Sequence, residues 1–266
     1  MRKLRKYIRL YRLLMAQFLK TMMQSKVDFF MGFLAFFTNQ LLGILFISVI
    51  FTQIPSLEGW GFYEILFVYG FAQIPRGIDH MFTDLIWILG QDMVLDGSFD
   101  RYLLRPINPL FHICADRFQP DGLGELVIGV IILAIAASQL SLVITPFWVL
   151  FFIVSVLLGT VIYTSIKLFF ASLAFWIKDS ISIMSLAYSF SDYAKYPLSI
   201  YNTPVRFILS YVIPFAFVAY FPAAALLGKE NLLPIIGLEA AVAAVAWVIA
   251  YQTFKIGVNR YESAGN

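Results

Sequence analysis

Residues 126 to 166 contain no charged side chain, and this run limits the possible folds more than any other feature of the sequence. A helix that crosses the hydrocarbon core of a bilayer needs about 20 apolar residues, so the run is long enough for two crossings. Pro146 lies inside the run, where a turn would let the chain reverse between two helices. With 61% hydrophobic and 13% charged residues, the sequence has the composition of a polytopic membrane protein.

We expect an all-α membrane protein with six transmembrane helices in a single domain, residues 1–266. Apolar runs place the spans at residues 29–57, 60–78, 123–143, 147–175, within 181–228, and at 232–254. Pro214 and Pro222 interrupt the fifth region, and irregular backbone at membrane depth must be covered by protein. The sequence therefore predicts a re-entrant or outer-leaflet helical hairpin at residues 195–230, before the last span.

The distribution of Lys and Arg predicts the orientation of the chain in the membrane. With a cytoplasmic N-terminus, 14 of the 19 Lys and Arg residues fall on the cytoplasmic side and three on the opposite side. Both termini should then be cytoplasmic, in a multi-pass protein of the cell membrane with no cleavable signal peptide. Because Cys114 is the single cysteine, no internal disulfide and no zinc-type metal site are expected.

Residues 1–26 predict an amphipathic helix that lies in the membrane interface. Its basic stripe comprises Arg2, Arg5, Arg9, Arg12 and Lys20, and apolar residues occupy the opposite face. Such a helix turns its cations towards anionic headgroups and its apolar face towards the acyl chains. Two roles stay open: an anchor that only sets orientation, or an elbow helix that also touches a peripheral partner.

The longest predicted cytoplasmic loop, residues 89–122, contains a segment rich in charge and proline. We expect a two-turn helix at residues 99–105, capped by Ser98 and ended by Pro106. Its apolar face would comprise Phe99, Tyr102 and Leu103, and its basic face Arg101 and Arg105. A helix this short is marginal alone, so it is either a connector packed on neighbouring helices or a helix that docks into another protein.

The same loop carries a motif by which the chain resembles the permease subunits of ABC-2 type exporters. The matching loop residues are Gly97, Asp100, Tyr102, Leu103, Leu104, Arg105, Pro106, Asn108, Pro109 and Leu110. Further matches follow in the expected order at residues 196–200, 213–217, 220–222 and 260–265. Residues 119–122, Gln-Pro-Asp-Gly, depart from the family pattern because they give the third span a more broken entry.

The resemblance implies a permease that pairs with a second permease subunit, the same or a related chain, and with two copies of a separate ABC ATPase. ATP and Mg would bind to that ATPase, because this chain has no phosphate-binding P-loop and is not expected to be an enzyme or to hold a cofactor. The loop helix would be the coupling helix, and the second and third spans would transmit its movement. The implied coupling residues are Ser98, Phe99, Asp100, Arg101, Tyr102, Leu103, Leu104, Arg105 and Pro106.

Ionisable residues near the inner half of the second span allow a different function. These residues are Arg76, Asp79, His80 and Asp84. Charges inside a bilayer are costly and mark a pair, a cavity or a proton path, so a proton-coupled secondary transporter is the alternative. In the simpler interpretation, Pro75 bends the helix and Arg76 pairs with Asp79 or Asp84. Lys167 is expected at the inner boundary, with its ammonium group extended to the headgroups, and a role facing a cavity stays open as the alternative. No serine-hydrolase or zinc-protease motif supports a membrane hydrolase.

Overall fold

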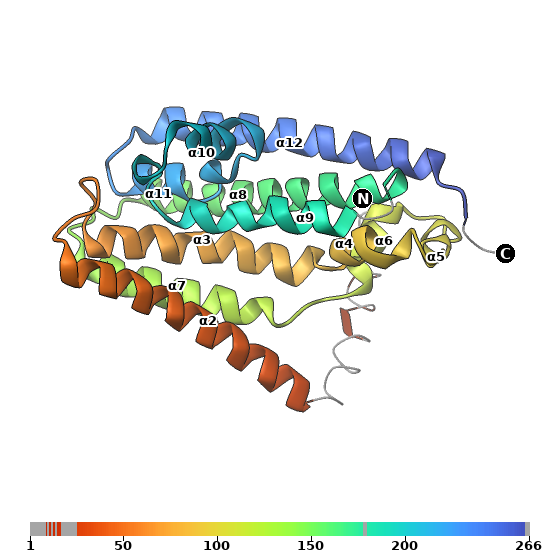
Figure 1. Cartoon of the computed structure of the whole chain (residues 1–266), viewed down its shortest axis with the longest axis horizontal. Coiled ribbons are helices and arrows are strands. Elements are labelled where there is room, and N and C mark those ends of the chain that lie inside the picture. Colours follow the sequence, from red (N-terminus) through yellow and green to blue (C-terminus); the bar gives the residue numbers. More distant parts are fainter. Residues whose placement is uncertain are drawn as a thin grey trace.

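A computed structural model of the chain describes residues 9, 11, 13, 15, 16, 26–177 and 180–263. Within these residues the ordered elements are helices and short helical turns, without a strand. Four long helices run lengthwise beside one another (Figure 1), namely α3 (Phe62–Thr83), α7 (Gly122–Gln139), α8 (Pro146–Ser172) and α12 (Leu232–Arg260). A further long helix, α2 (Lys26–Gln53), lies obliquely to them and diverges from them at its start. The predicted all-α class is therefore confirmed.

Three of the described helices are long and apolar enough to cross a membrane: α7, α8 with the following turn η2 (Leu173–Phe175), and α12. A fourth crossing is added if a bent pair of helical segments counts as one span. α3 has 22 residues, but it carries several charges. The membrane-spanning architecture is thus confirmed, whereas length and composition support three or four of the six predicted spans.

Short helical elements gather at the end of the bundle where α3 finishes, and we call this end the loop end (Figure 1). They are α4 (Leu85–Ile88), the π-helical turn η1 (Leu89–Met93), α5 (Asp100–Leu103) and α6 (Pro109–Asp116). Asn108 caps α6, because its Oδ1 accepts a hydrogen bond from the Phe111 backbone at 3.2 Å and Pro109 occupies the first helical position. The predicted loop therefore contains a second helix, α6, which was not predicted from the sequence.

The segment between η2 and α12 contains seven short pieces within its described residues 180–231. They are α9 (Ser180–Ser189), η3 (Phe190–Lys195), η4 (Leu198–Ile200), α10 (Thr203–Phe207), η5 (Ile208–Val212), η6 (Phe215–Phe217) and α11 (Tyr220–Leu226). The chain bends by 73° between residues 203–212 and residues 215–226, and Pro214 lies in this break. The bend falls inside the predicted hairpin region.

Contacts at its two ends show that this broken segment connects opposite ends of the bundle. Ser180 at the start of α9 donates a hydrogen bond of 2.6 Å to the carbonyl of Gly90 at the loop end. After α11, Lys229 Nζ lies 3.0 Å from Glu64 Oε1 in the first turn of α3. The segment therefore makes one net passage along the bundle despite its breaks.

α3 and α7 pack antiparallel with almost no space between their backbones. A Cβ atom added at Gly77 would lie 2.8 Å from the carbonyl oxygen of Gly122, and one added at Gly122 would lie 2.7 Å from that of Gly77. Glycine lets helices approach this closely, which membrane helices use to gain van der Waals contact. The Gly122 that ends the broken entry noted in the sequence therefore serves the packing of α7 on α3.

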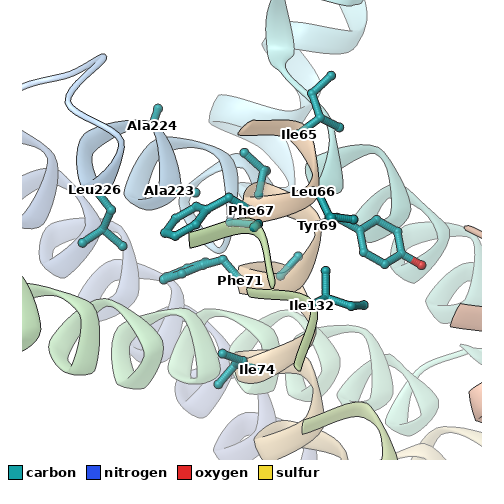
Figure 2. Close-up of a cluster of buried hydrophobic side chains, with 14 of the residues drawn as sticks. Ile65, Leu66, Phe67, Tyr69, Phe71, Ile74, Ile132, Ala223, Ala224 and Leu226 are labelled. Carbon is teal, nitrogen blue, oxygen red and sulfur yellow. The ribbon is translucent and has the colours of Figure 1, made fainter. Parts of the chain in front are cut away.

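A hydrophobic core surrounds the first half of α3 (Figure 2). Phe67 and Phe71 of α3 are fully buried, and Figure 2 shows the α3 side chains beside Ile132 of α7 and beside residues of α11. Ala223 and Ala224 of α11 are small, so the short helix can lie close to α3. This core holds the broken segment against the bundle.

Candidate functional site

The coupling segment, which we define as residues 98–106, has a shorter helix than the sequence predicts. α5 is a single turn, Asp100–Leu103, instead of the two turns expected at residues 99–105. The predicted N-cap role of Ser98 is wrong: its backbone N–H donates to Asp96 Oδ1 at 2.8 Å, and Phe99 takes the cap position without a side-chain bond. This bond lowers the pKa of the Asp96 carboxyl below its usual range. Gly97, with φ of 75°, makes the turn that places Asp96 there.

The apolar face of the coupling segment is only partly as predicted. Phe99 and Tyr102 are fully buried, whereas Leu103 is 40% exposed and Leu104 is 82% exposed. The prediction was wrong for Leu103, which is the last residue of α5 and lies at the surface. Two adjacent leucines therefore lie at the surface of the loop end.

Both arginines of the segment bond to α6. Arg101 lies 3.5 Å from the Asp116 carboxylate and donates to the Tyr102 hydroxyl at 2.6 Å, and that hydroxyl donates to Asp116 at 2.9 Å. Burial, together with the negative charge of Asp116, raises the pKa of Tyr102 to about 12. Arg105 Nη1 lies 3.0 Å from His112 Nε2. The basic side chains thus fix the segment to α6 and remain partly open to solvent.

His112 is held in its neutral form by this arrangement. An arginine can only donate hydrogen bonds, so His112 Nε2 must accept from Arg105 and cannot carry a proton. Burial of the ring, followed by the positive charge of Arg105, lowers the pKa of His112. The contact between the coupling segment and α6 therefore weakens when His112 is protonated.

A buried ion pair joins α3 to α8. Lys167 Nζ lies 2.6 Å from Asp79 Oδ2, and neither side chain is more than 1% exposed. Three hydroxyl groups donate to the same carboxylate, those of Thr83, Thr164 and Tyr188, at 2.6 to 2.8 Å. The expectation that Lys167 reaches the headgroups is wrong, because Asp79 offers it a fully paired site inside the bundle. The expected pairing of Arg76 with Asp79 is also wrong, because Asp79 pairs with Lys167 instead.

A second charged cluster connects α3 with α7 and η3. Arg76 lies 3.6 Å from Glu125 of α7 and 3.1 Å from Asp192 of η3, and Lys195 lies 2.7 Å from the same Asp192 oxygen. His80 lies 3.7 Å from Glu125, and its other ring nitrogen lies 3.6 Å from Asp84. The charges near the second span are paired as expected, but the partners of Arg76 come from segments distant in the sequence.

Two cavities lie against the bundle. The polar one, about 240 Å³, is bounded by α2, α3, α7 and η3, and its lining includes Gln40, Tyr69, Arg76, Glu125 and Lys195. It offers hydrogen-bonding groups and both signs of charge, so it can hold water or polar solutes inside the bundle. The other, about 500 Å³, is apolar and lies between α8, η5 and α12.

Among the described residues, no three His, Cys, Asp or Glu side chains could share a metal ion.

Most of the predicted basic stripe at the N-terminus lies outside the described residues. This applies to Arg2, Arg5, Arg12 and Lys20. Arg9 is described: its backbone is helical and its side chain is exposed. Nearby, the Tyr11 ring lies 6.4 Å from the Phe82 ring near the end of α3. This contact places residue 11 beside the loop end of the bundle.

One known protein family matches most of the chain. The profile of a family described as ABC-2 family transporter protein matches residues 37–265, from within α2 to beyond the end of α12. No curated protein and no solved structure matches the chain. The family match agrees with the bundle of apolar helices and with the resemblance carried by the loop motif. The chain therefore belongs to the ABC-2 transporter family, as a multi-pass membrane permease.

Proposed function

We propose that this chain is the permease subunit of an ATP-driven exporter and docks through its coupling segment onto a separate ABC ATPase. Two copies of the ATPase would bind ATP and Mg, and a second permease, the same or a related chain, would complete the translocation path. The membership of the chain in the ABC-2 family supports this function. The chain itself supplies the path and the docking surface, and hydrolysis takes place in the partner.

The exposed pair Leu103 and Leu104 is the observation that carries the docking proposal. A soluble surface tolerates single exposed leucines, but here Leu104, 82% exposed, lies next to Leu103, 40% exposed. The same segment is anchored by the fully buried side chains of Phe99 and Tyr102. Arg101 and Arg105 flank the two leucines and bond to α6, so the tip that the leucines form is held in one place. A rigid apolar tip between two cations fits an apolar cleft with an acidic rim on the ATPase.

We further propose six spans in the cell membrane, with both termini and the loop end in the cytoplasm. α2, α3, α7, α8 and α12 would each cross, and residues 180–227 would cross once in broken form. This broken segment starts beside Gly90 at the loop end and finishes beside Glu64 at the opposite end of the bundle. Its single net passage supports the count. The charge bias of the sequence supports the orientation, and residues 1–26 would lie in the inner interface as an amphipathic helix.

The rival function, a proton-coupled carrier, would use Arg76, Asp79, His80 and Asp84. Such a relay needs a carboxylate that is free to exchange protons along a path. Both oxygens of Asp79 are already bonded, to Lys167 and to three hydroxyl groups. This saturation supports the ATP-driven function, in which the cluster is structural.

The docking proposal is tested by purifying the full chain from its native membrane and measuring the ABC ATPase that copurifies with it. Leu104→Asp should reduce the association by roughly tenfold or more, about 1.4 kcal/mol, because a carboxylate would enter an apolar cleft. Arg101→Glu with Arg105→Glu should also reduce it by reversing the charge of the tip. Lys255→Glu is the matched control, since this exposed lysine lies near the same end on α12.

The outcome decides between the two functions. Retention of the ATPase by both loop variants at the level of the unchanged chain would refute the docking site. If no ABC ATPase copurifies and the purified chain transports protons alone in vesicles, the carrier function holds instead. In that case Asp79→Asn should abolish the proton movement.

A further inference from the structure

The residues that follow α12 pack directly against the coupling segment. Tyr261 contacts two aromatic rings edge-on: Phe99 of the coupling segment, with centroids 5.1 Å apart, and Phe175 after α8, with centroids 5.9 Å apart. Phe99 and Phe175 also meet edge-on, with centroids 5.3 Å apart. The three rings form a closed triangle that joins the coupling segment to the ends of α8 and α12.

Two hydrogen bonds add to this triangle, one before and one after Leu103 and Leu104 in the chain. Ser263 Oγ donates to the Asp100 carboxylate, and Asn108 Nδ2 donates to the Tyr251 hydroxyl at 3.0 Å. The end of α12 and its extension therefore hold the residues before and after the tip formed by Leu103 and Leu104. Figure 1 shows the blue end of α12 beside the α5 region.

The end of α12 is shaped for this contact. A side chain at Gly257 would collide with the Phe175 ring, so glycine leaves the space that the triangle needs. Phe254, one turn earlier, is buried in the same cluster and packs edge-on against Phe175 at 6.2 Å. The aromatic contacts are thus part of a packed core and not a surface coincidence.

We propose that Tyr261 and Ser263, which we call the C-terminal clamp, are positioning residues for the coupling segment. The clamp keeps the tip seated on α12, so that a displacement imposed by the ATPase moves α12 as well as α3 and α7. This inference rests on the proposed docking of the ATPase and adds a route that the loop motif alone does not indicate. It assigns a role to the Arg260 to Gly265 motif of the family resemblance, two residues of which make the clamp.

α12 is placed to carry the movement into the membrane. It lies along α8 for much of its length (Figure 1), and Ser155 of α8 donates a hydrogen bond of 2.7 Å to the buried carboxyl of Glu239 in α12. It also contacts α11 of the broken segment. A shift of α12 therefore reaches α8 and α11 directly, in addition to any movement that α3 passes to them.

The test follows the response of α12 to nucleotide in the complex of the full chain with its ATPase, reconstituted in lipid vesicles. Cys114→Ser with Lys255→Cys leaves one thiol, on the exposed face of α12, for an environment-sensitive fluorophore. Addition of ATP and Mg should change its fluorescence. Tyr261→Ala should abolish this change at ATPase concentrations that saturate binding, whereas Tyr261→Phe should retain it because the ring is preserved.

Two further variants separate a positioning role from a general loss of structure. Glu262→Ala changes the exposed neighbour of Tyr261 and should respond like the unchanged chain. Ser263→Ala with Tyr251→Phe removes both hydrogen bonds while leaving the three rings, and it should reduce the response without affecting ATPase binding. A full response in both this double variant and Tyr261→Ala, with the ATPase bound, overturns the clamp. Failure of the unchanged chain to bind the ATPase would instead overturn the proposed function, and the clamp with it.

Discussion

Lys167 and Asp79 illustrate how single residues in this chain are placed by their partners. Within an apolar helix, Lys167 has the sequence context of a residue at the membrane boundary, yet it is fully buried 2.6 Å from Asp79. A buried ion pair is tolerated only if both charges are compensated, and three hydroxyl donors complete the shell of Asp79 here. The pair fixes α3 against α8 at one relative position.

Loss of one member of this pair should destabilise the protein strongly. Lys167→Met leaves a buried carboxylate without its counter-charge, and we expect a loss of about 3–5 kcal/mol in the free energy of unfolding. Asp79→Asn combined with Lys167→Met should cost less than the sum of the single changes, because no isolated charge remains. Thermal unfolding of the purified protein in detergent measures this, with exposed Glu230→Gln as the control. Equal stability of Lys167→Met and the unchanged chain would contradict the assignment.

The packing of the coupling segment on α6 should weaken as the pH falls. The pKa of His112 is lowered in the folded protein, so the unfolded chain binds the proton more readily. The contribution of neutral His112 to the free energy of unfolding is therefore fully present above about pH 6.5, the ordinary pKa of histidine. It declines as the pH falls below that value. Limited proteolysis with trypsin after Arg101, normalised to cleavage of the denatured chain, should accelerate at about pH 5.5.

The matched variant for this pH effect is His112→Gln, which keeps an acceptor for Arg105 but does not titrate in this range. Its normalised cleavage rate should be nearly independent of pH between about 5.5 and 7.5. An equal acceleration in both chains would show that another group controls the opening of the segment.

At the scale of the elements, the contact between α3 and α7 depends on the absence of side chains. The backbones meet at Gly77 and Gly122, and this contact sets the depth at which Arg76 faces Glu125. A displacement of the two helices would therefore disturb both the apolar core and the charged cluster. Helix packing and electrostatics are coupled at this interface.

Gly77→Ala should consequently destabilise the bundle, although alanine favours a helix. The added methyl would lie 2.8 Å from two α7 backbone atoms, and such overpacking costs typically about 1–3 kcal/mol. Gly237→Ala in α12 is the control, because an added Cβ has no neighbour within 4 Å there and should be neutral or stabilising by up to about 1 kcal/mol. Comparison of the two thermal unfolding midpoints tests this. A Gly77→Ala midpoint at or above that of Gly237→Ala would contradict the close packing.

At the scale of the whole molecule, the two ends of the bundle differ in chemistry. The loop end carries the coupling segment, α6 and the basic end of α12, whereas the opposite end carries the turn between α2 and α3 and the bridge from Lys229 to Glu64. If the loop end faces the cytoplasm, the two ends must be reached by reagents from opposite sides of the membrane. The proposed orientation is thus open to a direct test.

Thiol labelling of intact cells should distinguish the two ends. In a Cys114→Ser background, Ser56→Cys lies in the exposed turn between α2 and α3 and should react with a membrane-impermeant maleimide. Leu104 is also exposed in the folded chain, at 82%, but Leu104→Cys should react only after the cells are permeabilised. Labelling of Leu104→Cys in intact cells would reverse the proposed orientation.

Local signals were sufficient for several elements. Thr145 with Pro146 marks the start of α8, and the structure places the cap there, with Thr145 Oγ1 accepting from the Trp148 backbone at 3.1 Å. The signals for α5 were misread because Asp96, not Ser98, makes the turn that precedes it. Asn108 and Pro109 carried the capping signal for α6, which was available in the sequence and missed.

The sequence by itself determined the membrane class, the helical architecture and the position of the break near Pro214, because hydropathy, proline and capping act over a few residues. Only the tertiary structure decided which charges pair, such as Arg76 with Glu125 and Asp79 with Lys167. It also brought Tyr261 to Phe99, which are 162 residues apart (261 − 99). These partners come from distant segments, and their distances depend on how closely helices such as α3 and α7 pack, which no local pattern encodes.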